Sequence, residues 1–287
     1  MKTYAVSVIS AFGTDTLQGN PAGVCLMEAF APDAMLQDIA AQMNLAETAF
    51  TVARGENSFE LRWFTPTMEV DLCGHATLAT AHALVMLGRV DADLPILFHT
   101  RSGILTAHIE DAAIALELPL QPGVPLPMNT QFQACFAPPI LFAQRNDGNY
   151  LVEVATAAEV NDCTPDLRAI RALEAEGIII TAKGEMVDYV YRYFAPAIGI
   201  DEDPVTGSAN GQLAPYWSAR LGKENMVAHQ LSAEGGELHV AMHHSHVRVS
   251  GQVRSRGARL IESRHTMKDQ CGDVSDGGFQ NSRSAAA

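Results

Sequence analysis

The sequence is short of basic residues. Lysine and arginine number 19 against 33 aspartates and glutamates, a formal net charge of -14 over 287 residues. Nucleic acids and anionic membranes select for basic patches, so neither is expected as a partner. No apolar run approaches the roughly 20 residues of a membrane-spanning helix, and the first residues alternate like a strand without a small-residue cleavage site. These absences indicate a cytoplasmic protein that acts on a small molecule.

Several common signatures of bound groups are also missing. The five cysteines are scattered and contain no C-x-x-C pair, so neither a disulfide framework nor a structural zinc site of the usual spacing is supported. The two glycine turns discussed below lack the lysine of a phosphate-binding loop and do not match G-x-G-x-x-G. We therefore expect no cofactor and no metal.

The length and the patterning suggest two domains. A chain of 287 residues, 47% of them hydrophobic, can bury two cores. A proline-rich stretch at 118–128 divides it into domains 1–118 and 119–255. Strand patterns dominate both, and each contains one apolar helix that should be buried on all sides. Beyond Ser255 the pattern fades, so 256–287 is expected to be a poorly ordered tail.

An internal repeat links the two halves. R-W-F-T-P at 62–66 matches R-Y-F-A-P at 192–196, with an offset of 130, and C-G-H-A-T at 73–77 matches T-G-S-A-N at 206–210, with an offset of 133. In each copy a strand ends at an aromatic residue and proline, an acidic loop follows, and a glycine turn begins the apolar helix. Chance agreement of short patterns is the alternative. The repeat predicts two versions of one structural unit.

The two glycine turns could form one anion site. If the halves pack face to face, free amides at the helix starts can bind one carboxylate, and they belong to Gly74, His75, Gly207 and Ser208. The acidic run 201–203 raises the alternative of a magnesium site. Neighbouring side chains in that run should diverge before the following proline, which disfavours a metal.

Two residues could carry protons. His75 stands at a helix start, where the dipole lowers the imidazole pKa and keeps the ring neutral. A capping or packing histidine is the alternative. Glu47 lies where the chain enters an apolar strand, and an apolar wall would raise its pKa into the range of a general acid or base. A solvated helix-end glutamate is equally compatible with the spacing, so the sequence pattern leaves this choice open.

Four segments carry a family resemblance. They are Q-G-N-P-A-G-V at 18–24, N-L-A-E-T-A-F at 44–50, F-T-P-T-M-E-V-D-L-C-G-H-A-T at 64–77 and E-D-P-V-T-G-S-A-N-G at 202–211. In them the chain resembles the PhzF-like isomerases of phenazine biosynthesis, which share the diaminopimelate epimerase type of fold. The resemblance implies an α+β fold of two similar domains, each a curved β-sheet or barrel around a central helix, related by a pseudo-twofold. It is also compatible with a homodimer.

The resemblance assigns roles to the site residues. It implies a cofactor-independent isomerase that moves a proton on a small carboxylate-bearing substrate between the domains. Its catalytic residues would be Glu47, His75, Asp203 and Ser208. Its substrate-binding residues would be Asn20, Cys73, Gly74, Thr206 and Gly207.

Two other functions remain open. An amino-acid epimerase or racemase of the thiol type would need two opposed cysteines, one in each half. The first half offers Cys73, but none of the other four cysteines lies in the second glycine turn, whose repeat-aligned residues are Thr206 and Ser208. Serine is a poor base without help, so this mechanism is disfavoured. A non-catalytic carboxylate-binding or interaction protein could keep the same cleft. Two departures from the family favour that reading: Asn210 stands where histidine is common, and 256–287 does not look like the closing strand.

Overall fold

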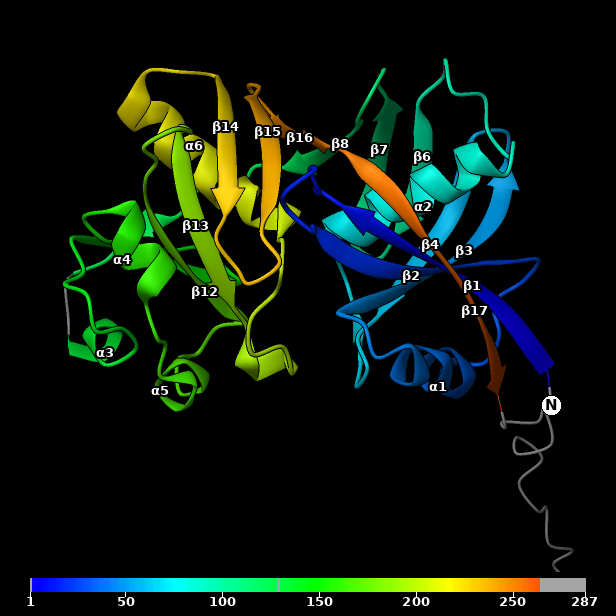
Figure 1. Cartoon of the computed structure of the whole chain (residues 1–287), viewed down its shortest axis with the longest axis horizontal. Coiled ribbons are helices and arrows are strands. Elements are labelled where there is room, and N and C mark those ends of the chain that lie inside the picture. Colours follow the sequence, from blue (N-terminus) through cyan, green and yellow to red (C-terminus); the bar gives the residue numbers. More distant parts are fainter. Residues whose placement is uncertain (1, 128–129, 264–287) are drawn as a thin grey trace, which may run out of the picture.

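The computed structural model describes residues 2–127 and 130–263. The first half contains β1 (Lys2–Ala11), β2 (Asn20–Met27), α1 (Asp33–Met43), β3 (Glu47–Gly55), β4 (Ser58–Phe64), β5 (Glu69–Val70), α2 (Gly74–Met86), β6 (Ile96–Thr100), β7 (Gly103–Ile109) and β8 (Ile114–Pro119). These elements form the lobe that surrounds α2, on the right in Figure 1.

The second half forms the other lobe, around α6 (Figure 1). It contains β9 (Val124–Pro125), α3 (Thr130–Gln133), β10 (Phe142–Arg145), β11 (Asn149–Glu153), α4 (Ala157–Asp162), α5 (Leu167–Arg171), β12 (Gly177–Lys183), β13 (Tyr189–Phe194), the 3-10 turns η1 (Pro196–Ile198) and η2 (Gly207–Ala209), α6 (Asn210–Leu221), β14 (Asn225–Gln230), β15 (Gly236–Met242) and β16 (His246–Gly251). The last strand, β17 (Val253–Ser263), returns to the first lobe and pairs with β1.

The order of strand pairing repeats between the lobes. In the first lobe β2 and β3 are parallel, β3 and β4 antiparallel, and β4 and β6 parallel. In the second lobe β11 and β12 are parallel, β12 and β13 antiparallel, and β13 and β14 parallel. The equivalent strands β8 and β16 pair with each other, antiparallel, with Leu118 opposite Val247. The topology thus confirms the internal repeat and places a pseudo-twofold between β8 and β16.

A matching ion pair fixes the acidic loop of each copy. Arg62 donates from Nε and Nη2 to the two carboxylate oxygens of Glu69, both at 2.7 Å. Arg192 makes the same fork with Glu202 at 2.7 and 2.8 Å. Each guanidinium also lies over the phenylalanine two positions further along its own strand, at 5.2 and 4.9 Å. Bidentate pairs of this kind fix geometry, so these two glutamates hold the loops in place.

Removing one of these arginines should weaken the fold. Arg192 also donates from Nη1 to the carbonyls of Val160, Asn161 and Cys163, at 3.4, 3.2 and 2.8 Å. Arg192→Met leaves these acceptors and Glu202 unpaired, and an unsatisfied buried group costs roughly 1–3 kcal/mol. We expect the free energy of unfolding in urea to fall by about 2 kcal/mol.

The matched control is Arg54→Met. Arg54 faces Glu60 at 3.5 Å with both side chains about half exposed, and exposed pairs contribute roughly 0–1 kcal/mol. An Arg192→Met variant no less stable than Arg54→Met would contradict the structural role of the fork.

The two central helices share one hydrophobic core. All residues of α2 from Gly74 to Ala81 are buried, as the apolar pattern predicts, and the core cluster around α2 continues to Leu213 of α6. Within the second lobe, Trp217 of α6 stacks on Tyr189 with ring centroids 5.8 Å apart. Smaller clusters lie beneath α1 and beneath α4 and α5. The core therefore spans both lobes, and the division at 118/119 stays a prediction.

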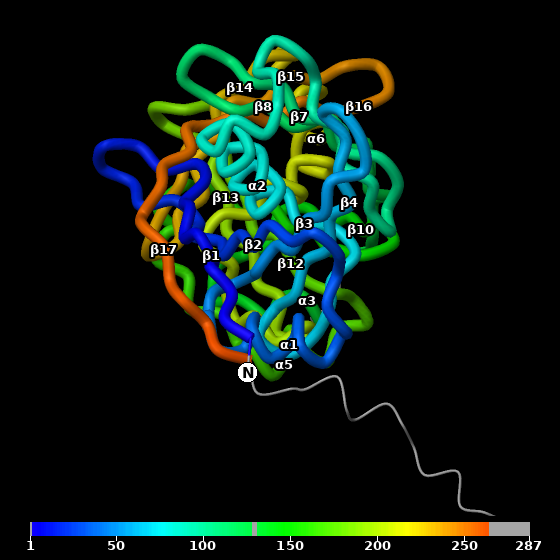
Figure 2. Tube along the Cα trace, turned by 90° about the vertical axis from the view of Figure 1, so that its right-hand side faces the viewer, coloured from blue at the N-terminus to red at the C-terminus, as the bar shows by residue number. Residues whose placement is uncertain are grey.

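The expected tail is wrong for residues 256–263, which belong to β17. This strand pairs antiparallel with β1 from Ser263 opposite Lys2 to Val253 opposite Ala11, and the two strands run side by side in Figures 1 and 2. Its central side chains are exposed, so backbone hydrogen bonds rather than an alternating apolar pattern hold it. The closing strand is thus present. Residues 264–287 of the expected tail lie outside the described residues.

Candidate functional site

A cavity of about 980 Å³ opens between the lobes and is lined by both. Eight of the nine expected site residues line it: Glu47, Cys73, Gly74, His75, Asp203, Thr206, Gly207 and Ser208. Asn20 does not belong to its wall. Its side chain is fully buried behind His75 and Asp203 and contacts both of them. Asn20 is therefore placed to orient these residues rather than to touch a substrate.

The two glycine turns meet at the cavity. A Cβ atom added to Gly74 would lie 3.5 Å from the backbone nitrogen of Ser208 and 3.7 Å from the Cα atom of Gly207. Helix α2 begins at Gly74, whereas the second turn begins with η2 at Gly207 and becomes α-helical only at Asn210. The two turns thus lie against each other, as the repeat predicts, and a shared anion between them stays a prediction.

Asn210 supports the second turn from beneath. Its Nδ2 donates to the Gly207 carbonyl at 3.1 Å, and its Oδ1 accepts from the Tyr189 hydroxyl at 2.5 Å. The asparagine is completely buried, so both polar ends of its side chain need partners. Asparagine at this position therefore has a structural role in shaping the turn.

Glu47 is buried, so the alternative of a solvated helix-end glutamate is wrong. Glu47 is the first residue of β3, and its carboxyl group lies in the cavity wall rather than in solvent. Burial raises its pKa well above the usual carboxyl value, and the nearby Asp203 charge raises it further. The side chain is thus a buried carboxyl group that holds a proton more tightly than an exposed glutamate.

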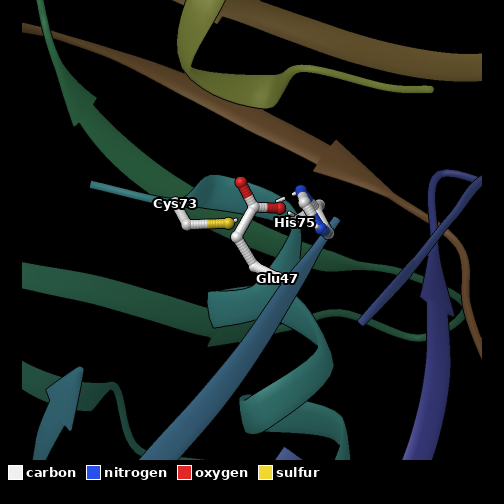
Figure 3. A group of neighbouring side chains, drawn as sticks. All are labelled: Glu47, Cys73 and His75. Carbon is white, nitrogen blue, oxygen red and sulfur yellow. Dashed lines mark hydrogen bonds and ion pairs between the residues drawn. The ribbon is translucent and has the colours of Figure 1, made fainter. Parts of the chain in front are cut away.

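Three side chains converge in this wall (Figure 3). Nε2 of His75 lies 3.2 Å from Oε2 of Glu47, but the two atoms are not aligned as a hydrogen bond and neither has another partner. Nδ1 of His75 lies 3.5 Å from Sγ of Cys73. Burial lowers the pKa of His75 to about 3, so the ring is neutral as expected, although burial rather than the helix dipole is the cause. Burial and Glu47 raise the pKa of the Cys73 thiol, which therefore stays protonated.

A hydrogen-bond network holds Asp203 in place. Its carboxylate accepts from Nδ2 of Asn20 at 2.6 Å and from Oγ1 of Thr206 at 2.5 Å. Burial raises the Asp203 pKa, and these two donors oppose that rise. Gln230, which the sequence analysis did not identify, accepts from the Thr206 amide at 2.6 Å and donates to the Asp203 carbonyl at 2.5 Å. No local sequence signal marks Gln230, because strand pairing brings β14 to this loop.

The side chains of the acidic run 201–203 point to different surroundings, as predicted. Asp201 is exposed, Glu202 binds Arg192, and Asp203 faces the cavity. Within the described ranges, three side chains of types that can bind a metal instead lie together at Glu47, Cys73 and His75, with their ligand atoms within 4.8 Å of one another.

Comparisons with known proteins give consistent matches. The family described as phenazine biosynthesis-like protein matches residues 9–258. A protein of Halalkalibacterium halodurans named as an uncharacterized isomerase is 39% identical over 256 residues, covering 88% of this chain and 96% of its own. The human phenazine biosynthesis-like domain-containing protein is 38% identical over 285 residues, covering 89% and 96%.

Solved structures show the same fold. A PhzF-family phenazine biosynthesis protein from Enterococcus faecalis matches with a TM-score of 0.85 and 36% identity, over 91% of this chain and 100% of its own. A hydroxyproline epimerase from Agrobacterium vitis matches with a TM-score of 0.59 over 91% of each chain, at 9% identity, which speaks for the fold alone. The architecture is thus of the diaminopimelate epimerase type. No helix among residues 2–127 and 130–263 is long and apolar enough to cross a bilayer.

Proposed function

Because the chain belongs to the phenazine biosynthesis-like family, in which close relatives are named isomerases, we propose that it moves a proton on a small carboxylate substrate bound between the lobes. The observation that carries the proposal is the buried carboxyl group of Glu47 beside the paired helix starts at Gly74 and Gly207. A cytoplasmic location and a homodimer stay predictions.

The proposed reaction uses one group twice. The amides at the two helix starts bind the substrate carboxylate and stabilise negative charge as it grows. Ionised Glu47 removes a proton from a carbon next to an activating group, and the electron pair of that C–H bond stays on the substrate. Glu47, now protonated, gives a proton to another carbon, so no net proton is consumed. Between the two steps its carboxyl proton can exchange with solvent, so deuterium oxide labels the substrate at carbon. Its raised pKa suits both steps, because it makes the carboxylate a stronger base than an exposed one.

A thiol epimerase is the second candidate, favoured by Cys73 in the cavity wall and by the fold shared with the hydroxyproline epimerase, which holds trans-4-hydroxy-L-proline. That route requires two opposed acid/base groups. The second turn offers Thr206 and Ser208, and the Cys73 thiol is held in its protonated form. We therefore assign the proton transfer to Glu47.

The test is solvent exchange. The protein is incubated with a panel of unsaturated and amino carboxylates in deuterium oxide, and deuterium at carbon is followed by NMR. We expect exchange on at least one carboxylate. If none exchanges while carboxylates still bind in the cavity, the chain is a binding protein and the isomerase proposal fails.

Asp203→Asn should shift the pH dependence of that exchange. The negative charge of Asp203 raises the pKa of Glu47, so a neutral amide should lower it. Exchange requires ionised Glu47, and the acid limb of its pH profile should therefore move to lower pH. The rate above that limb should fall, since Glu47 becomes a weaker base.

The control for this shift is Asp201→Asn, which removes an exposed charge two positions away that does not line the cavity. Its pH profile should match that of the unaltered protein. An unmoved limb in Asp203→Asn would mean that the titrating group is not Glu47, or that Asp203 is not charged beside it.

A further inference from the structure

Glu47, Cys73 and His75 have the arrangement of an open metal site. Each offers one ligand atom within 4.8 Å of the others, and the three side chains point toward one another in Figure 3. Bonds of about 2.0–2.3 Å place the ligands of a tetrahedral zinc ion roughly 3.3–3.8 Å apart. The separation of 3.5 Å between Sγ of Cys73 and Nδ1 of His75 already lies in that interval.

One ligand atom has no hydrogen-bond partner, and a second is paired with a group of the same site. Oε2 of Glu47 is buried without a partner. Nδ1 of His75 lies 3.2 Å from Nδ2 of Asn20, but that amide has only two hydrogens. They are directed at closer acceptors, Oδ1 of Asp203 at 2.6 Å and the Val205 carbonyl at 3.0 Å. Nδ1 also lies 3.5 Å from the Cys73 thiol, and loss of the thiol proton on metal binding frees its lone pair for a cation. The Oε2 atom of Glu47 is free already.

The electrostatic surroundings and the burial also suit a dication. Glu47, Cys73 and His75 are 7%, 5% and 2% exposed, and unpaired buried acceptors are costly. Asp203 adds a second carboxylate to the same wall, whereas Arg145 is the one lysine or arginine among the residues that line the described cavity. Three protein ligands facing a cavity leave a fourth position for water or a carboxylate, as in zinc sites that are open to small molecules.

We propose that Glu47, Cys73 and His75 bind one thiophilic divalent cation such as zinc. Binding forms a metal–sulfur bond and releases the thiol proton to solvent, so the affinity rises with pH. The ion also occupies the Glu47 carboxylate. If Glu47 is the acid/base group of the proposed function, the bound ion inhibits proton transfer, and the site makes the enzyme sensitive to free zinc.

Cobalt(II) is the probe that tests the site directly, because a cobalt–thiolate bond produces a charge-transfer band in the near ultraviolet. The full chain, freed of metal with a chelator, is titrated with cobalt(II) and then with zinc. We expect one equivalent of cobalt to produce the band, with visible bands of four-coordinate cobalt, and zinc to abolish both. Cys73→Ser should remove the charge-transfer band and weaken binding by about 100-fold or more, since outer-shell changes alone cost roughly 10–100-fold.

Matched variants separate this site from others. Cys25→Ser removes a thiol buried elsewhere, in β2, and should leave the band unchanged. His229→Gln disrupts a surface cluster in which Glu237 lies 3.0 Å from His229 and 3.3 Å from His239, and it should also leave the band unchanged. His75→Gln keeps the thiol and should weaken binding, with thermal melts verifying that each variant is folded.

Three results would overturn the proposal: no charge-transfer band at one equivalent, a band that survives in Cys73→Ser, or a band lost in His229→Gln. If Cys73→Ser does not fold, the result with His75→Gln decides in its place. No substrate enters this experiment. A failure of cobalt binding therefore leaves the proton-transfer proposal intact, and a failure of carbon-bound deuterium exchange leaves the metal site intact.

Discussion

Glu47→Gln is expected to slow deuterium exchange by about 10³-fold, within the roughly 10²–10⁴-fold contribution of a positioned general acid or base. Glutamine keeps the shape of the side chain but can neither accept nor return the proton. The amides at the two helix starts remain, so carboxylate binding should change far less than the rate. Rates are measured by NMR on whichever panel member exchanges, with affinity measured separately by calorimetry.

The stability of Glu47→Gln shows whether slower exchange comes from the missing acid/base group or from a damaged fold. A carboxyl group whose folded pKa is raised contributes stability that is fully present below its unfolded pKa and is lost as the pH rises through the folded pKa. Because the Glu47 pKa is raised, Glu47→Gln should gain stability relative to the unaltered protein at pH values above the usual carboxyl range. A surface control, Glu117→Gln, should leave exchange unchanged. Exchange near the original rate in Glu47→Gln would remove Glu47 from the mechanism.

Gly74→Ala is expected to lower carboxylate affinity or the exchange rate by about 10²-fold while preserving the fold. The new methyl group would lie 3.5 Å from the Ser208 nitrogen, an ordinary van der Waals contact. It would therefore occupy the space that an anion oxygen needs in order to reach that amide. Loss of one such donor costs roughly 10²–10³-fold in rate, and alanine in a helix is otherwise favourable.

Gly55→Ala is the matched control. A methyl group there would meet only the Cβ atom of Ser58, at 3.9 Å, far from the cavity wall. Its affinity and rate should equal those of the unaltered protein. If Gly74→Ala binds and exchanges carboxylates as well as Gly55→Ala does, the anion site does not lie between the helix starts.

The repeated unit was predictable because its signals are local. The arginine two residues before a phenylalanine, the proline after it and the glycine turn all lie within short stretches. The structure shows that the same arginines form the paired forks with Glu69 and Glu202. Helix starts depend on neighbours in sequence, and the two apolar helices follow the glycine turns as predicted.

The missed features depend on contacts between distant segments. Strand β17 has a run of exposed side chains and exists because β1 supplies its hydrogen bonds, which no pattern within 253–263 encodes. Gln230 forms its hydrogen bonds with Thr206 and Asp203 only because β14 lies beside the loop of the second glycine turn. Likewise, the raised pKa of Glu47 depends on its burial and on the charge of Asp203, which is distant in sequence, so spacing along the chain could not decide its environment.

The pairing of β8 with β16 has the geometry of an isologous contact, in which the same surface of two copies meets itself. Here both copies belong to one polypeptide, so one gene can change them independently. A symmetric dimer would have to carry Cys73 and His75 twice, whereas this chain presents Thr206 and Ser208 at the matching positions. Covalent joining of the halves thus permits a chemically one-sided cleft within a nearly symmetric scaffold.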